Sequence, residues 1–194
     1  GLAIVRMDGW EGKCGFIDQN FNEIIPPKYE DIIYRNGLIS VSLFDKWGLF
    51  DRFGNEIIPP KYDIICSFNC GLATVSLNKK WGYINRTGME LIQPTYSNAY
   101  SFCEGLGAVC LNGKWGFIDH SGIELISLIF DDVQPFSDGL AEVKLNGKWG
   151  FINQKGEIKI AIKYDEVCHF YNGTARVAMD GKWSTVDRIG NLVQ

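Results

Sequence analysis

The chain contains 194 residues, of which 46% are hydrophobic and 22% are charged, and its formal net charge is −4. This length and hydrophobic content are enough for an extended core. The acidic balance argues against nucleic-acid binding, since domains that bind nucleic acids normally carry an excess of basic residues. No run of 18 apolar residues is present, and the first residues match a strand of the repeat described below, so we expect neither membrane insertion nor a signal peptide.

A tryptophan recurs every 34 residues along most of the chain. Glycine follows it in four of the five copies, and a period of this kind marks a tandem array. A framework that is copied along a chain favours a scaffold over an enzyme, whose catalytic residues are needed only once. We expect the five tryptophans of the series to form the structural core of the repeats: Trp47, Trp81, Trp115, Trp149 and Trp183.

Each copy opens with an alternating strand and a tight turn. Within residues 71–77, Ala73 and Val75 point to one side and Thr74 and Ser76 to the other, which is the period of a half-buried strand. An Asn-Gly or Asp-Gly pair follows the equivalent strands at residues 112–113, 146–147 and 180–181. Because a type I′ turn requires positive φ at both central residues, these pairs predict β-hairpins.

The second strand carries the Lys-Trp-Gly sequence and ends in another turn. Asp or Asn closes this strand and glycine follows three residues later, as in Asp119 and Gly122, which predicts a turn opened by an Asx side chain. The third strand is apolar and bears proline, as at residues 56–63. Since proline cannot donate to a β-ladder, we expect this strand to be short, bent or at a sheet edge.

The sequence predicts an all-β fold. No window shows a sustained helical stripe, and 22 glycines interrupt the chain too often for long helices. We expect three-stranded units to stack as an open, solenoid-like superhelix; a closed β-propeller-like ring is the alternative, although its blades usually have four strands and about 40 residues or more. Residues 1–194 form a single array, with units at about 1–36, 37–70, 71–104, 105–138, 139–172 and a partial 173–194.

The repeated sequence resembles a known family. The pattern Gly-Leu-Ala-x-Val-x-x-Asn-Gly-Lys-Trp-Gly-Phe-Ile-Asp, followed by Glu-Ile-Ile-Pro-Pro, is similar to the WG-containing repeat of bacterial proteins, also called the KWG repeat, over essentially the whole chain. The resemblance implies a repeat architecture and no catalytic activity, so it supplies no catalytic residues. Cys14 and Ser184 depart from the Trp-Gly dipeptide, and Trp10 lies in a three-residue insertion. The array stops part-way through a repeat, which leads us to expect a piece of a larger protein.

Two interpretations are open for each repeated aromatic or basic position. The tryptophans form a core ladder in which each glycine gives room for the next indole, or they form an aromatic shelf for a sugar ring or a quaternary ammonium. The lysines that precede them keep the hairpin edges soluble and block strand addition, or they follow an anionic polymer. We favour the first interpretation in each case. The lysines are Lys46, Lys80, Lys114, Lys148 and Lys182.

No catalytic or metal-binding pattern emerges from the polar residues. Asp51, Asp119 and Asp187 lack the dense spacing of a calcium loop, so turn capping is the preferred interpretation. Asp119, His120 and Ser121 include triad residue types, but their contiguity in a turn is wrong for a relay that needs convergence in space. We therefore predict no catalytic residue, no metal site, no cofactor and no enzymatic activity.

The six cysteines occupy scattered positions of the repeat and include no Cys-x-x-Cys pair. Cys70 lies one position from the equivalent of Cys103, so stacking of neighbouring turns raises the hypothesis of a bridge between them. Free thiols are the default expectation, and they mildly favour a reducing compartment such as the cytoplasm. The sequence assigns no compartment beyond that.

The positions between the framework residues point to a protein partner. Five sites that we place on an outward face change in size and charge between copies, and these are Ser40, Thr74, Glu142, Lys144 and Arg176. A shelf for one polymer would look alike in every copy, so we predict a non-catalytic scaffold that mediates protein–protein interaction. The alternative is a carbohydrate- or cell-wall-binding module that uses aromatic faces, namely Tyr34, Tyr83, Tyr100 and Phe117.

Overall fold

The computed structural model describes residues 3–7 and 12–193, which form strands and turns and contain no helix. Trp10 of the predicted insertion lies outside these residues. The first sheet contains β1 (Ala3–Arg6), β2 (Cys14–Ile17) and β3 (Glu23–Tyr29), and the second contains β4 (Asp31–Arg35), β5 (Leu38–Leu43), β6 (Lys46–Asp51) and β7 (Glu56–Tyr62). The described part of the chain contains no helix long and apolar enough to cross a membrane.

Four further sheets repeat the arrangement of the second. The third contains β8 (Ile64–Ile65), β9 (Leu72–Leu77), β10 (Lys80–Asn85) and β11 (Glu90–Tyr96), and the fourth contains β12 (Asn98–Ala99), β13 (Gly107–Leu111), β14 (Lys114–Ile118) and β15 (Glu124–Phe130). The fifth contains β16 (Asp132–Val133), β17 (Leu140–Leu145), β18 (Lys148–Asn153) and β19 (Ile158–Tyr164). The sixth contains β20 (Glu166–Val167), β21 (Thr174–Met179), β22 (Lys182–Asp187) and β23 (Leu192–Val193).

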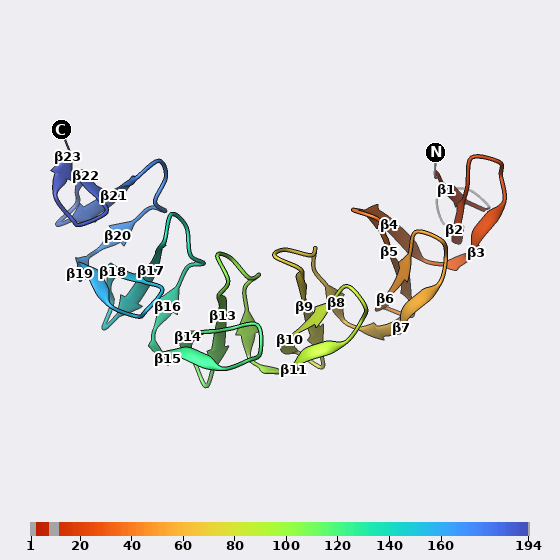
Figure 1. The fold of residues 1–194 in the computed structure, drawn as a ribbon, viewed down its shortest axis with the longest axis horizontal. Helices are drawn as coiled ribbons and strands as arrows, with labels where there is room; N and C mark the ends of the chain where they lie inside the picture. The colour runs from red at the N-terminus through yellow and green to blue at the C-terminus, as the bar shows by residue number, and fades with distance from the viewer. Residues whose placement is uncertain (1–2, 8–11, 194) are drawn as a thin grey trace.

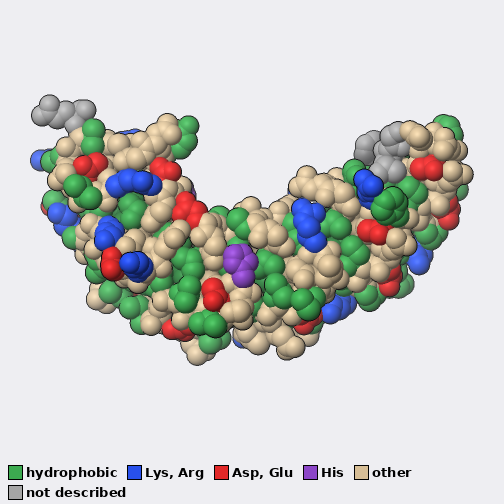
Figure 2. All heavy atoms as spheres, in the orientation of Figure 1, with side chains coloured by type: hydrophobic (Ala, Val, Ile, Leu, Met, Phe, Trp, Pro, Cys, Tyr) green, Lys and Arg blue, Asp and Glu red, His purple; other side chains and the backbone are tan. Residues whose placement is uncertain are grey.

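The sheets stand one after another along an open crescent with its two ends apart (Figure 1). Within each sheet the strands pair antiparallel in chain order, and a single residue such as Asp63 links the last strand of one sheet to the first strand of the next. Figure 2 shows the same crescent as a solid body with a concave upper edge. The predicted all-β fold and open array are confirmed.

The sheets differ from the predicted units by a short first strand. Most of these first strands are two residues long, as in β8, and pair with the middle of the following strand through Ile64–Ser76 and Ile65–Val75. The second to sixth sheets therefore have four strands, and each of them begins a few residues before the predicted unit. The proline-bearing strand is seven residues long rather than short, but it lies at the sheet edge and its pairing is bulged, as expected.

The core lies between sheets rather than within one. Leu49 of the second sheet packs with Ala73, Val75 and Ile84 of the third, and all four side chains are fully buried. One face of a sheet thus covers the opposite face of the next, as nearest-neighbour stacking in a repeat protein requires. Burying a Val, Leu or Ile side chain contributes about 1.5–3 kcal/mol, so these junctions supply most of the hydrophobic stabilisation.

The hairpin turns have the predicted backbone. Asn112 and Gly113 have φ of 53° and 75°, and the turns at residues 146–147 and 180–181 also have positive φ at both central positions. These values are those of a type I′ turn, which matches the right-handed twist of the flanking strands. Asn78 and Lys79 adopt the same backbone without glycine, with φ of 52° and 62°.

The glycine of the Trp-Gly dipeptide serves a different purpose from the one predicted. A Cβ on Gly82 would lie 2.4 Å from the Ile92 carbonyl oxygen and 2.6 Å from the Pro94 nitrogen. The pairing of β10 with β11 shifts register at this point, so the backbone of the proline-bearing strand passes directly over the glycine. Gly82 therefore makes room for the third strand of its own sheet and not for the indole of the next repeat.

Polar contacts tie each sheet to its neighbour. Lys148 Nζ donates to Asp165 Oδ1, and the other oxygen of Asp165 accepts a 2.8 Å bond from the Asp180 nitrogen in the next hairpin. Lys148 lowers the pKa of the Asp165 carboxyl through this hydrogen bond. Lys46 pairs with Asp63 and Lys114 with Asp131 in the same way, so these lysines of the predicted row are partnered.

Candidate binding pockets between neighbouring sheets

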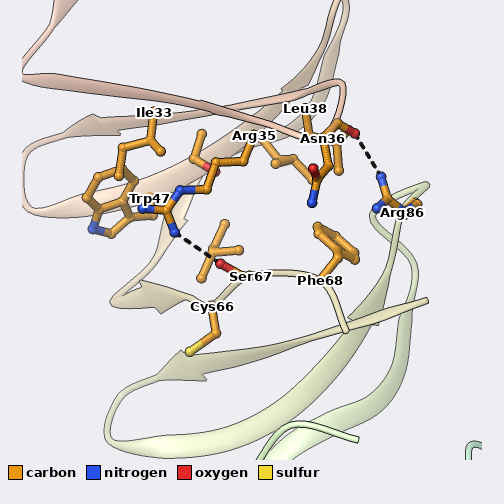
Figure 3. A pocket seen from close by; sticks show the side chains of 12 residues that line it. Ile33, Arg35, Asn36, Leu38, Trp47, Cys66, Ser67, Phe68 and Arg86 are labelled. Carbon is orange, nitrogen blue, oxygen red and sulfur yellow. Dashed lines mark hydrogen bonds between the residues drawn. The ribbon is translucent and has the colours of Figure 1, made fainter. Parts of the chain in front are cut away.

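Two pockets open between sheets, and we name them the basic pocket and the acidic pocket. The basic pocket, with a volume of about 100 Å³, lies between the second and third sheets (Figure 3). Strands β4, β5 and β6 form one wall, while β8, the loop after it and the turn between β10 and β11 form the other. The pocket is therefore a product of stacking and belongs to neither sheet alone.

Arg35 and Arg86 give the basic pocket its charge. Arg35 Nη1 donates to the Ser67 hydroxyl at 3.3 Å, and Arg86 Nη1 donates to the Asn36 carbonyl oxygen at 3.2 Å. The two guanidinium groups lie toward opposite ends of the pocket in Figure 3. No Asp or Glu is among the residues that line it within the described part of the chain. The pocket thus holds two positive charges without a carboxylate to offset them.

The acidic pocket lies between the fifth and sixth sheets and has a volume of about 350 Å³. Gln134, Glu142 and Trp149 line it on one side and His169 on the other. Glu142 is 2% exposed, its Oε1 lies 3.1 Å from His169 Nδ1, and its Oε2 has no hydrogen-bond partner among the described residues. Because burial disfavours the charged carboxylate, the pKa of Glu142 is raised.

The two pockets occupy the same place in the repeat. Trp47 lines the basic pocket and Trp149 the acidic one, and both are half-buried. In the fourth sheet, Tyr100 stacks on the equivalent Trp115 with ring centroids 5.0 Å apart, and Trp115 is only 8% exposed. The repeated tryptophan thus lies beside arginine at the pocket of the second sheet, beneath a tyrosine ring in the fourth sheet and beside a carboxylate at the pocket of the fifth sheet.

The predicted outward face is corrected by the structure. Ser40, Thr74, Glu142, Lys144 and Arg176 lie on the face that each sheet turns toward the next. Thr74 and Glu142 are buried, Ser40 and Lys144 are half-buried, and Arg176 of the sixth sheet is exposed. Alternation failed to separate core from solvent here because stacking covers both faces of a sheet. The structure brings Ser40 and Glu142 to the two pockets, which sequence reasoning did not foresee.

The tryptophans are not equivalent members of the core. Trp115 is 8% exposed and Trp183 is 43% exposed, while Trp47, Trp81 and Trp149 are half-buried. The position two residues later is fully buried in four consecutive sheets, and it is occupied by Leu49, Tyr83, Phe117 and Phe151. Its signal in the sequence is a large apolar residue in every one of these copies. The central core column therefore follows the tryptophans rather than coinciding with them.

The aromatic residues of the carbohydrate alternative do not form an exposed shelf. Tyr83 and Phe117 are fully buried, Tyr100 is half-buried against Trp115, and Tyr34 alone of the four is exposed, at 40%. The expectation that these aromatic faces meet solvent is wrong for Tyr83 and Phe117. The reason is again that neighbouring sheets cover both faces of a strand.

The acidic turn residues act as caps. Asp119 Oδ1 accepts hydrogen bonds from the backbone nitrogens of Ser121 and Ile123 at 2.8 and 3.0 Å, which confirms the predicted Asx turn. Asp51 and Asp187 accept equivalent bonds in their own turns. His120 stacks on the Phe102 ring at 4.5 Å. These contacts account for Asp119 and His120 through turn and packing geometry.

All six cysteines are free thiols. Cys14 and Cys110 are buried, and Cys70 is exposed. Partial burial raises the pKa of the Cys103 thiol, with a smaller contribution from nearby Cys70. The structure contains no bridge between Cys70 and Cys103, contrary to that hypothesis. The free thiols agree with the default expectation.

The fold defines a class of protein, an open array of antiparallel sheets that stack as repeats, with pockets at two of the junctions. The sequence model described as WG containing repeat matches five consecutive stretches of the chain, at residues 15–46, 47–81, 81–115, 115–149 and 149–183. The chain belongs to the WG-containing repeat family, as the repeated motif indicated. A search of curated protein sequences found no match.

Solved structures with the same fold are distant in sequence. A eukaryotic initiation factor is similar over 100% of this chain and 62% of its own, with a TM-score of 0.54 and 15% identity. Hsv2p of Kluyveromyces lactis is similar over 98% of this chain and 72% of its own, with a TM-score of 0.52 and 10% identity. These structures are β-propeller-like repeat proteins, and at this level of identity the likeness shows the fold alone.

Proposed function

We propose that this array is a non-catalytic scaffold that mediates protein–protein interaction, as part of a larger protein. The observation that carries the proposal is the difference between pockets at equivalent junctions. Arg35 and Arg86 line one, whereas Glu142 and His169 line the other. A regular polymer would meet the same chemistry at each repeat, while a folded or extended protein partner meets a surface that changes along its length.

The size of the basic pocket supports the same conclusion. Pockets for small molecules usually have volumes of about 300–1,000 Å³. The basic pocket is smaller, at about 100 Å³, and suits the end of one inserted side chain. Carbohydrate binding has less support, because Tyr83 and Phe117 of its expected aromatic surface are buried and offer no face for stacking.

A pull-down from native lysate tests this function. The bait is the whole array, and the test variant combines Arg35→Glu and Arg86→Glu in the basic pocket. Arg52→Glu is a matched control, because Arg52 holds the same place in the turn between β6 and β7 as Arg86 does between β10 and β11, and it does not line the pocket. We expect a discrete protein to be retained by the array and the control and lost with the double variant, with all three baits giving the same circular dichroism spectrum.

Recovery of glycan alone, or of nothing, would contradict the proposal. Retention of the same protein by the double variant would place the interaction away from the basic pocket.

A further inference from the structure

The basic pocket has an excess of hydrogen-bond donors. A guanidinium group carries five N–H donors, and the hydrogen bonds of Arg35 and Arg86 go to one neutral acceptor each, the Ser67 hydroxyl and the Asn36 carbonyl. Neither arginine forms an ion pair with a described residue. Both side chains belong to exposed residues, so donors remain available to a ligand at the mouth of the pocket.

Apolar side chains lie between the two arginines. Leu38, Ile65 and Phe68 are half-buried and line the pocket, and the Arg86 guanidinium lies 5.2 Å from the centre of the Phe68 ring. Figure 3 shows Arg35 extending toward Trp47 at one end and Arg86 beside Asn36 at the other. The pocket therefore combines an apolar floor with a positive group toward each end.

The geometry points to a short acidic segment of a protein partner, with one apolar side chain seated on Leu38 and Phe68 and carboxylates on either side of it at Arg35 and Arg86. This inference rests on the proposed scaffold function and names the chemistry of its partner. Guanidinium groups pair with carboxylates through charge-assisted hydrogen bonds, and an apolar side chain of Leu or Ile size matches the small volume between them.

A long polyanion fits this surface less well. Binding along a phosphate backbone rewards a row of unpaired cations, whereas Lys46, Lys114 and Lys148 of the repeat are paired with aspartates. The net charge of −4 also opposes non-specific attraction of polyanions. The pocket offers two guanidinium groups, at Arg35 and Arg86, so a short acidic stretch of the partner is enough to pair with both.

Fluorescence anisotropy with the full chain tests the inference. The probe is a labelled, end-blocked peptide of sequence Gly-Asp-Glu-Leu-Glu-Asp-Gly, compared with an analogue in which every acidic residue is its amide and a second in which glycine replaces leucine. We expect the acidic peptide to bind at least about tenfold more tightly than the amide analogue, since charge-assisted pairs contribute that much or more. The glycine analogue should bind several-fold more weakly, as expected for one lost buried apolar side chain.

Arginine variants locate the binding. Arg35→Gln and Arg86→Gln should each weaken binding of the acidic peptide about tenfold, and Arg52→Gln should leave it unchanged. Absence of binding at millimolar peptide, equal binding of the amide analogue, or full affinity of the glycine analogue would overturn the inference. Competition by inorganic phosphate that matches the peptide in affinity would also overturn it, because the pocket would then be a simple anion site.

The two proposals fail in distinguishable ways. If the lysate yields a protein whose capture depends on Arg35 and Arg86 while the acidic peptide does not bind, the scaffold function stands and the chemistry of the segment is wrong. If the peptide binds as described while the lysate yields nothing, the pocket has its assigned ligand chemistry and the scaffold function loses its support.

Discussion

Replacement of Gly116 by alanine should destabilise the array more than the same replacement at Gly113, three residues earlier in the same hairpin. A Cβ on Gly116 would lie 2.5 Å from the Ile126 carbonyl oxygen and 2.8 Å from the Leu128 nitrogen. Real Cβ atoms do not approach backbone closer than 3.0 Å, so β15 must move by roughly half an ångström or more. A Cβ on Gly113 would meet nothing within 4 Å.

The magnitude follows from these two environments. Overpacking against backbone costs about 1–3 kcal/mol, and a displaced edge strand loses one or two hydrogen bonds worth about 1 kcal/mol each, so we expect a loss of about 2–5 kcal/mol for Gly116→Ala. Gly113 has φ of 75°, and an alanine there costs about 1–2 kcal/mol from backbone strain alone. Both variants gain the same few tenths of a kcal/mol from a less flexible unfolded chain.

Urea denaturation followed by circular dichroism measures both variants. The free energy of unfolding is compared at equal m-values, because a change in m would mean that the repeats no longer unfold together. Equal losses for Gly116→Ala and Gly113→Ala would refute the conclusion that the third strand of a repeat, here β15, passes directly over the Trp-Gly glycine. A loss confined to Gly113→Ala would do so as well.

Three other outcomes are expected. Glu142→Gln should raise the free energy of unfolding by about 1 kcal/mol near neutral pH. Burial raises the pKa of folded Glu142 above the ordinary Glu pKa of 4.5, so the buried carboxyl costs stability only at pH values above 4.5. Thermal denaturation should therefore show that the gain vanishes below pH 4.5. Asn153→Ala should cost about 1–2 kcal/mol in urea denaturation, since its Oδ1 accepts two backbone hydrogen bonds of 3.0 Å, and Asn153→Asp should cost less. Thiol titration of unfolded protein should give six thiols with or without prior reduction, whereas an increase on reduction would reveal a bridge such as the one between Cys70 and Cys103.

The turns could be predicted from sequence because their causes are local. Asn112 and Gly113 need only their own φ preferences to form a hairpin turn, and Asp119 reaches the nitrogens of residues two and four positions later. The open array also follows from the period and composition of the chain. The turns are confirmed because each depends on residues that are neighbours in sequence, and the array is confirmed because its period is visible in the sequence itself.

The short first strands and the buried faces depend on residues far apart in sequence. Ile64 and Ile65 are too few to show alternation, and they become a strand only by pairing with β9. Thr74 reads as an outward residue by periodicity, but stacking of the next sheet buries it. Alternation of apolar and polar residues distinguishes a buried face of a strand from a solvent-exposed one. It cannot do so when both faces are covered.

The pockets were beyond sequence analysis for a related reason. Arg35 and Arg86 belong to different sheets and come together only through stacking, and neither occupies a position at which the repeat is basic in every copy. The sequence shows Glu142 as a variable position of the repeat, but it does not show the contact with His169, which joins the fifth sheet to the sixth. A site built at a junction has no motif, because its residues are contributed by two repeats.

The framework also explains why these junctions can differ in chemistry. The glycine of each Trp-Gly dipeptide is constrained by the backbone of its own third strand, and the Asx residues are constrained by their turns, so substitution at either place disturbs a whole sheet. Ser40 and Glu142 pair with Leu49 and Phe151 of their own sheets in the same register, although one side chain is small and the other charged, so the residue at this place can change without altering the pairing of strands. An array of this construction changes the chemistry of its junctions from repeat to repeat while its fold stays the same, and this is the property that the proposed recognition of a non-repeating protein partner requires.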